Sequence, residues 1–454
     1  MNRKQQLLLL AIGAFLILCG CKRDYTHAEA TASVNGTGQS APEDWTAGVK
    51  DTGQVRDGWI KNFHDIELDS LVDEAMKNNP NLQAAAARVD RANALAKQAG
   101  AALSPTVDLG GQLAGGSGQP SASAQGVGLG ISWEADVWGR LGLTEKSAET
   151  SARAVAADYE FARQSLAAST ARGWFLLCET NRQIEFLKSI VGMLENMYRI
   201  EQKKQETGKV TAMEVSQVHA SLAEAKDAVV KAEAARQESA RSLETLIGRY
   251  PADNMTGADT LAATPPPIPV GQPSAILERR PDIIAAEDRV AAAFYAEKGA
   301  ELLHLPRFTI QAGTGINALG DAIAGLTAGL FAPLYTGGEI EGQIEQATAE
   351  QKEAVANYAA AALKAFKEVE TALTNEDLLK KREELLTSAV EDNRKTYELS
   401  KLQYDVGKID MFEVLSHQAA WTGSEISLLN VKRRRLDNRI SLHLALGGSF
   451  EEAK

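Results

Sequence analysis

Residues 305–338, LPRFTIQAGTGINALGDAIAGLTAGLFAPLYTGG, determine the fold of the whole chain. Two segments within them, at about 306–317 and 324–335, alternate apolar residues with polar residues or glycine, which is typical of a β-strand with two unlike faces. The stretch 339–405 that follows contains no proline and is rich in Ala, Glu, Lys and Leu. A helix of that length is on the order of 100 Å long, several times the thickness of a membrane core. Two strands that lead into so long a helix indicate a protein that crosses a bilayer and projects far from it.

The first half of the chain carries a similar pair of segments, at about 104–114 and 126–138. In the second of these, Val127, Leu129 and Ile131 fall on one face, whereas Gly128 and Ser132 fall on the other. In a soluble sandwich the apolar face would be core. In a membrane barrel it would face lipid, and the polar face would line water. Alternation alone fits both structures.

Landmarks in the sequence recur about 200 residues apart, which indicates an internal duplication. The pairs are Pro80 and Pro281, Pro105 and Pro306, Gly208 and Gly407, and Gly248 and Gly447. We therefore predict a first repeat at 59–248, a linker at 249–274, a second repeat at 275–447 and a tail at 448–454. Each repeat is expected to contain a helix, two strands, a very long helix, a tight turn and a returning helix.

Four strands per chain are too few for a closed barrel. An open sheet edge in lipid leaves backbone groups unpaired, at a cost of several kcal/mol each. Bacterial barrels begin at about eight strands, and eight strands leave an interior filled by side chains. Two copies would reach only that number, whereas three copies give 12 strands around a passage. The sequence therefore predicts a homotrimer, with a 12-stranded membrane barrel that continues as a tube of coiled-coil-like helices.

The N-terminus has the pattern of a secretory signal at 1–20, because Arg3 and Lys4 precede an apolar run that is too short to span a membrane. The run ends at Leu18-Cys19-Gly20-Cys21, which resembles a bacterial lipoprotein signal. The resemblance implies that Cys21 becomes the first residue and carries N-acyl and S-diacylglycerol chains, such as palmitate, in outer-membrane lipid. A plain secretory signal with a chance cysteine is the alternative. Residues 21–58 are rich in Gly, Thr, Ser and Asp and are predicted to form an extended tether.

The composition argues against nucleic-acid binding and against catalysis. The formal net charge is -12, and phosphate binding needs clustered Lys and Arg. The basic cluster at 432–435 lies beside acidic residues and is interpreted as a solvated helix face. The six histidines are scattered without metal-ligand spacing, and the sequence shows no phosphate-binding loop or nucleophile elbow. We expect no enzyme activity, no metal and no cofactor other than the lipid.

Several motifs resemble the outer membrane factor family, the TolC-like and OprM-like efflux ducts, in its NodT-type lipoprotein branch. They are LERRPDI at 277–283, WEADVWGR at 133–140, LYTGG at 334–338, and Tyr404 with Gly407 and Val414-Leu415. The resemblance covers 59 to 450. It implies an outer-membrane exit duct that conducts small molecules passively and contributes to drug resistance. It also implies a periplasmic adaptor protein and an inner-membrane transporter of the RND type as partners.

In this family, rings of acidic residues close the periplasmic end of the tube just after the final hairpin turn. Alignment on Gly407 places the first acidic position at Glu413 and the second at Ser416, so the chain departs from the paired pattern. Asp410 lies one turn before Glu413 and is predicted to take the place of the missing acid. Three copies of an acid at a constriction would attract cations. The alternative is that Asp410 and Glu413 are ordinary surface acids near a turn.

Other positions receive roles from their place in the predicted architecture. Tyr404 and Asp405 precede the final turn and are predicted to hold the closed state. The predicted barrel lumen contains Asp108, Glu134 and Asp136, and Trp133 and Trp138 are expected near the membrane interface. The hairpin tips, predicted to dock the adaptor, contain Gly208, Lys209, Gly407 and Lys408.

Two other functions fit parts of the pattern. The exit duct of a type I protein-secretion system uses the same architecture, although the acyl anchor and the lipoprotein branch favour small-molecule efflux. A lipid-anchored periplasmic helical scaffold would also use long helices. A scaffold, however, has no need of four alternating strands at duplicated positions.

Overall fold

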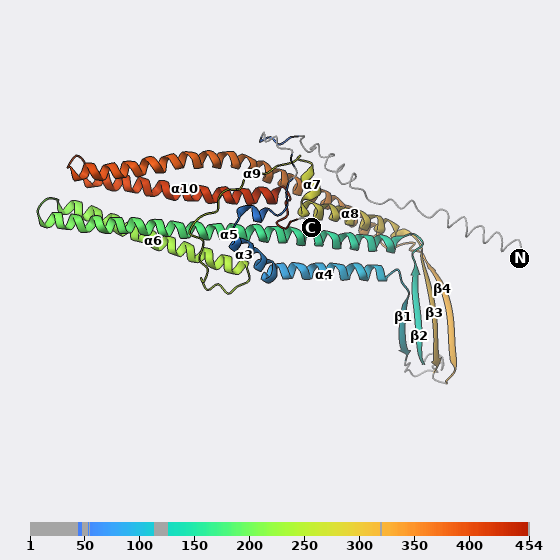
Figure 1. Cartoon of the computed structure of the whole chain (residues 1–454). Coiled ribbons are helices and arrows are strands. Elements are labelled where there is room, and N and C mark those ends of the chain that lie inside the picture. Colours follow the sequence, from blue (N-terminus) through green and yellow to red (C-terminus); the bar gives the residue numbers. More distant parts are fainter. Residues whose placement is uncertain (1–43, 48–52, 54, 113–125, 318–319, 453–454) are drawn as a thin grey trace. The chain divides into compact units, whose positions relative to one another are not determined.

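The computed structural model describes residues 44–47, 53, 55–112, 126–317 and 320–452 (Figure 1). The predicted signal and Cys21 lie outside these residues, as do most of the predicted tether and part of the strand predicted at 104–114. In chain order the elements are η1 (Trp59–Phe63), α3 (Ile66–Asn78), α4 (Pro80–Ala101), β1 (Thr106–Gln112), β2 (Gly126–Ala135), α5 (Arg140–Glu206), α6 (Ala212–Leu246), α7 (Ala275–Arg279), α8 (Pro281–Glu301), η3 (Leu302–His304), β3 (Arg307–Asn317), β4 (Ala322–Phe331), α9 (Glu339–Asp405) and α10 (Met411–Ala445).

The two halves of the chain contain helices of equal length. α5 and α9 each have 67 residues, and α6 and α10 each have 35. Among the described residues, no helix combines the length and the apolar character that a membrane-spanning helix needs. By its internal contacts the chain divides into two compact units, of which the first holds 86–159 and 282–362. The second unit holds the described parts of 41–85, 160–281 and 363–454.

The first unit contains a four-stranded antiparallel sheet in the order β1-β2-β3-β4 (Figure 1). Its register places residues of like character side by side, because Leu129 pairs with Leu109, Val127 with Ile316, and Ala312 with Leu326. Side chains alternate between faces along a strand, so one face of the sheet is almost wholly apolar. That face is uncovered: Leu109 is 74% exposed and Leu326 is 77% exposed.

Two strands end earlier than the sequence pattern predicts. β2 stops at Ala135 rather than at 138, because the next residue, Asp136, accepts hydrogen bonds from the first turn of α5. β4 starts at Ala322 and stops at Phe331 rather than at 335. Pro333 follows β4 closely and lacks the N–H group that a strand donates to its neighbour. In both strands, the alternation of apolar residues in the sequence therefore continues past the last residue that is paired with a neighbouring strand.

Two helical hairpins, α5 with α6 and α9 with α10, lie mostly in the second unit, which holds α6, α10, and α5 and α9 from 160 and 363 onward (Figure 1). The chain reverses at Gly208 and at Gly407, whose φ angles of 70° and 73° lie in the left-handed region that glycine adopts readily. Equivalent backbone hydrogen bonds close both turns: Lys209 N donates to Lys204 O and Lys408 N to Gln403 O, both at 2.9 Å. Thr211 and Asp410 then cap the returning helices.

The basic cluster at 432–435 is only partly the solvated face that the sequence suggested, because Lys432 and Arg434 are exposed whereas Arg433 and Arg435 are not. The side chains of Arg433 and Arg435 are each only 17% exposed. Arg433 pairs with Glu179 and with Asp437, and Arg435 lies 2.5 Å from Glu383. The acids that compensate this charge come from α5 and α9 as well as from α10, so tertiary packing brings them together.

Part of the predicted tether is docked on the second unit. Trp45 is only 4% exposed, and its indole nitrogen donates to Gly271 O at 3.0 Å. The backbone amides of Thr46 and Ala47 donate to the carboxylate of Glu370 at 2.7 and 3.0 Å. The ring centre of Trp45 also lies 6.4 Å from that of Phe366. The tether was predicted from the polar composition of 21–58, and the large apolar side chain of Trp45 is a local exception to that composition.

Candidate functional site

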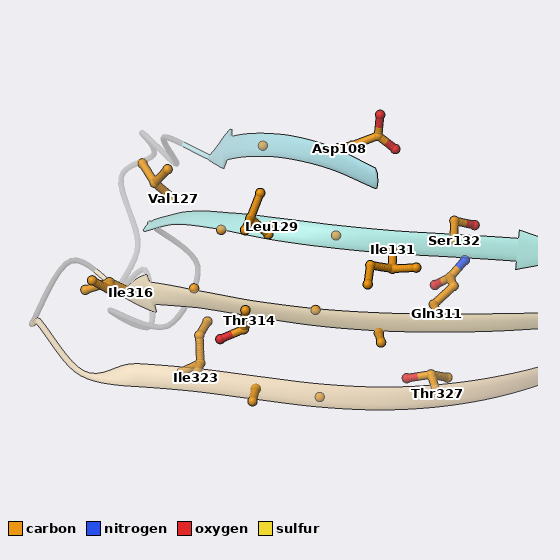
Figure 2. Close-up of a pocket in the computed structure, with 18 of the residues that line it drawn as sticks. Asp108, Val127, Leu129, Ile131, Ser132, Gln311, Thr314, Ile316, Ile323 and Thr327 are labelled. Carbon is orange, nitrogen blue, oxygen red and sulfur yellow. The ribbon is translucent and has the colours of Figure 1, made fainter. Parts of the chain in front are cut away.

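The second face of the sheet combines glycine with polar side chains. The pairs Asp108–Gly130, Ser132–Gln311 and Gln311–Thr327 lie across neighbouring strands (Figure 2). Nearer the other end of the strands, Gly110 pairs with Gly128, Gly128 with Gly315, and Gly313 with both Gly130 and Gly325. A hollow of about 760 Å³ lies at this part of the sheet. Its lining includes these glycines and the four polar residues, and also apolar residues such as Val127, Leu129, Ile131, Ile316 and Ile323.

Two of these glycines, Gly128 and Gly315, are required by the close approach of the strands. A Cβ atom at Gly128 would lie 2.8 Å from Thr314 O, and one at Gly315 would lie 2.7 Å from Val127 O. Both distances are too short for a side chain, so the face stays bare there. The sheet therefore carries one apolar face and one face that is rich in glycine and small polar groups, with the exposed side chains of Ile323 and Phe331 along β4.

The predicted lumen residues do not lie together. Asp108 is exposed and lines the hollow (Figure 2), whereas Glu134 and Asp136 lie outside its lining. Glu134 forms an ion pair with Arg140 at 2.7 Å. The carboxylate of Asp136 accepts from Leu141 N at 3.0 Å and from Gly142 N at 2.8 Å, at the positive end of the α5 dipole. Both acids therefore fix the junction between β2 and α5.

The two tryptophans predicted near the membrane interface also form hydrogen bonds to the backbone at this end of the sheet. The indole of Trp133 donates to Leu103 O at 2.9 Å, and that of Trp138 donates to Pro306 O at 2.7 Å. Each acceptor lies just before a strand, so the two side chains tie the entries of β1 and β3 to β2. Indole combines an apolar ring with one donor, which suits a position between lipid and water.

At the hairpin tips, Gly208, Lys209, Gly407 and Lys408 are all exposed. Asp405 is exposed as well. These positions are free for contact with a partner within the part of the chain that the structure describes.

Asp410 has a structural task in addition to its predicted one. Its carboxylate accepts from Glu413 N at 3.0 Å and so caps α10. Both carboxylates are exposed, and they lie three residues apart at the start of the helix. Negative charge is stabilised there by the helix dipole. The structure thus brings Asp410 and Glu413 together at one helix end.

Tyr404 lies in a contact that the sequence did not predict. Its hydroxyl donates to Glu201 Oε2 at 2.6 Å, and Lys204 Nζ lies 2.9 Å from Glu201 Oε1. Lys204 also lies 4.5 Å from the centre of the Tyr404 ring. Burial, and then the neighbouring Glu201 carboxylate, raise the pKa of Tyr404 well above its usual range. Tyr404 therefore remains a neutral donor.

Glu201 is the functional candidate that sequence reasoning missed. It is only 1% exposed and joins α5 to α9 through Tyr404. The available signal was its position: with Ile190, Leu194 and Met197 it continues the three-and-four spacing of a buried helix stripe. A carboxylate in such a stripe needs a partner, and Tyr404 and Lys204 supply one.

In the described part of the chain, no three His, Cys, Asp or Glu side chains gather closely enough to hold a metal ion. The surfaces that remain are the glycine face of the sheet and the acidic helix starts near the hairpin turns.

The sequence pattern of one family, described as outer membrane efflux protein, matches residues 71–249 and 272–448. The chain belongs to the outer membrane efflux protein family. Each matched segment spans one of the two halves described above, and the resemblance noted from the motifs is confirmed. The protein is an outer-membrane efflux channel.

Curated relatives of this efflux protein match along nearly their whole length. The pyoverdine export outer membrane protein OpmQ of Pseudomonas aeruginosa is 28% identical over 475 residues, with 98% of this chain and 97% of that protein covered. The toluene efflux pump outer membrane protein TtgC of Pseudomonas putida is 26% identical, with 99% and 96% covered. The cation efflux system protein CusC of Escherichia coli is 24% identical, with 87% and 89% covered.

Solved channels share the fold of this efflux protein. The outer membrane channel CmeC of Campylobacter jejuni superposes with a TM-score of 0.84 at 22% identity, covering 92% of this chain and 94% of that one. The open state of the MtrE channel of Neisseria gonorrhoeae gives 0.76 at 22% identity, covering 91% and 98%. The predicted fold class, a membrane β-barrel combined with a long α-helical barrel, is confirmed.

Proposed function

We propose that three copies of this chain form one sealed exit duct, anchored in the outer membrane, through which small molecules leave the cell passively. The observation that carries the proposal is the sheet of the first unit. Among the described strands, β1 and β4 each pair with only one neighbour, and the apolar face is uncovered. In lipid such edges must pair with further strands. Three copies supply 12 strands, enough to enclose a passage.

In such a barrel the glycine face of the sheet lines the passage. Asp108 would then be a lumen charge near a stretch of bare backbone, and Glu134 and Asp136 would hold the helices to the barrel rim. A wall rich in glycine and small polar groups offers few fixed contacts, which suits conduction better than tight binding. The relatives, named for pyoverdine, toluene and cations, point to varied cargo rather than to one compound.

The proposed duct is passive and depends on partners. A periplasmic adaptor protein docks on the hairpin tips around Lys209 and Lys408, and an inner-membrane transporter, of the RND type, supplies the energy. Acyl chains on Cys21 hold the N-terminus in the membrane. The proposed gate consists of the acidic ring that three copies of Asp410 and Glu413 would form, with Asp405 and Tyr404 beside it. Supporting this gate, all four residues lie around the second hairpin turn.

Planar-bilayer recording of the purified, full-length protein tests the proposal. We expect stepwise conductance increments of one size, with cations preferred over anions because the gate is acidic. A glycine-face variant, Gly313→Phe, should lower each increment without abolishing insertion. The matched control is Leu326→Phe on the apolar face, which should leave the increment unchanged. Equal effects of the two variants, or no conductance at all, would overturn the proposed duct.

A further inference from the structure

The four described strands contain only three charged residues, and all three lie on the glycine face of the sheet. They are Asp108 in β1, Glu134 in β2 and Arg307 in β3. Asp108 lies opposite Gly130 and Glu134 lies opposite Thr309, whereas Arg307 precedes Thr309 by two residues. Because side chains alternate between the faces of a strand, this register puts all three charges on the same side. The apolar face of these strands carries no charge.

Two of the three charges have no partner in the part of the chain that the structure describes. Glu134 forms an ion pair with Arg140 at 2.7 Å, and this pair contributes little net charge. Asp108 and Arg307 are both exposed, and neither side chain forms a hydrogen bond or an ion pair with another described residue. The glycine face therefore presents one acid and one base whose charges are not compensated within the copy.

This acid and this base lie far apart along the strands. Asp108 is aligned through Gly130 with Gly313, which lies six residues beyond Arg307 in β3. Six residues of a strand span about 20 Å. Arg307 lies at the end of the sheet that adjoins the helices, and Asp108 lies farther from that end. Salt screens charges beyond about 8 Å at physiological ionic strength, so each charge acts separately on the ions near it.

In the proposed duct the glycine face lines the passage, so three copies turn each charge into a ring. We propose that the two rings make the barrel a charge filter in two steps. The Arg307 ring, next to the helices, opposes cations, and the Asp108 ring, farther out, opposes anions. The inference rests on the proposed trimeric duct. It is separate from the proposed acidic gate, whose residues lie at the second hairpin turn.

The order of the two rings gives the filter a direction. Anions gather at the Arg307 ring and cations gather at the Asp108 ring. A voltage that is positive outside drives cations inward past Asp108 and anions outward past Arg307, so both collect between the rings and the conductance rises. The opposite voltage empties the same stretch. The current should therefore be larger when the exterior is positive. Asp321, which precedes β4 at the outer end, has the same sign as Asp108 and adds to this order.

Planar-bilayer recording of the full-length protein tests the filter. The parent for all variants is Asp410→Asn with Glu413→Gln, which removes the charge of the proposed gate from the comparison. Protein is added to one chamber, and its helices stay on that side, because polar helices of 67 residues do not cross lipid. We expect the current with the exterior positive to exceed the reverse current by about 2-fold in about 0.1 M salt, and the two to become equal in about 1 M salt.

Two double variants keep the net charge of the passage and change only the arrangement of the charges. Asp108→Asn with Arg307→Gln removes both rings and is the matched control, in which the two currents should become equal. Asp108→Arg with Arg307→Asp exchanges the rings, and the current should then be larger when the exterior is negative.

The single variants test each ring by itself. In a salt gradient, Asp108→Asn should shift the reversal potential toward anion preference, and Arg307→Gln should shift it toward cation preference. These two measurements also decide the proposal if the exchanged variant fails to insert, because neither neutral substitution introduces a charge.

Equal current ratios in the parent and in both double variants would overturn the filter and leave the proposed duct intact. Reversal potentials that shift in the single variants, without any difference between the two currents of the parent, would mean that the rings do not act in sequence, and would overturn the filter as well. No conductance in the parent or in the native protein would reject the proposed duct, and the filter with it.

Discussion

At the scale of single residues, a substitution of Asp410 must distinguish the effect of its negative charge from the effect of its capping hydrogen bond. Its carboxylate caps α10 through Glu413 N, so Asp410→Ala would cost about 1 kcal/mol of helix stability whether or not the charge serves a gate. Asn is an equally good cap without the charge. Asp410→Asn is therefore the informative substitution, and Glu413→Gln is its counterpart.

We predict that the double variant Asp410→Asn, Glu413→Gln keeps the α10 cap but loses cation preference, because the ring of negative charge is removed. The measurement is the reversal potential in a salt gradient across a planar bilayer. The control is Glu214→Gln, which neutralises the corresponding acid after the first hairpin turn. An unchanged reversal potential in the double variant would return Asp410 and Glu413 to the class of surface acids.

A second prediction at this scale concerns His443 and the dependence of stability on pH. It is buried against Trp59, with ring centres 5.6 Å apart, and burial followed by the charge of Arg439 lowers its pKa from 6.5 to about 3. Between these values the unfolded chain binds a proton that the folded chain does not. Stability is therefore lost as the pH falls below about 6.5, at up to about 1.4 kcal/mol per pH unit.

The variant His443→Phe should remove this part of the acid sensitivity while keeping an aromatic ring on Trp59. Thermal midpoints between pH 7 and pH 4 measure it, with His219→Phe as the control. If the native protein and His443→Phe lose stability in parallel over this range, the acid sensitivity has another source.

At the scale of elements, the long helices were predictable and the contacts between them were not. The start of α5 at Arg140 and the breaks at Gly208 and Gly407 follow from local sequence, because glycine and capping residues act on their own neighbours. The sheet register follows from alternation, since a slip by one residue would exchange the faces.

What the sequence could not show depends on tertiary structure. Glu201 and Tyr404 are about 200 residues apart in the chain, and nothing local reveals their hydrogen bond. Likewise, the alternation along β2 assigns Glu134 and Asp136 to its polar face. The strand, however, ends between them, and Asp136 accepts a hydrogen bond from the first turn of α5 instead. Periodicity locates a face and does not say where pairing stops.

We predict that Gly407→Ala loosens the second hairpin turn, because a left-handed residue with a Cβ atom costs about 1 kcal/mol. Hydrogen exchange of the amides flanking the turn should quicken by roughly 5-fold. The control is Gly192→Ala inside α5, where a Cβ meets nothing within 4 Å and alanine favours the helix. Similar exchange in both variants would mean that the turn is not held by this conformation.

At the scale of the whole molecule, both halves supply strands to one sheet, and β2 pairs with β3 across the two halves. A single chain thus makes a sheet with an apolar face, a glycine face and two edges. The apolar face is unfavourable in water, and the two edges are unfavourable in lipid. Both are satisfied if copies close a barrel in lipid, with the glycine face lining the passage. The need for partner copies is therefore built into the sheet.

The most direct test is the mass of the particle extracted from the outer membrane in mild detergent, measured by native mass spectrometry without heating. The account predicts three chains per particle, each carrying acyl chains at Cys21, and conversion to single chains on heating. A single chain that stays folded in water without detergent would contradict it.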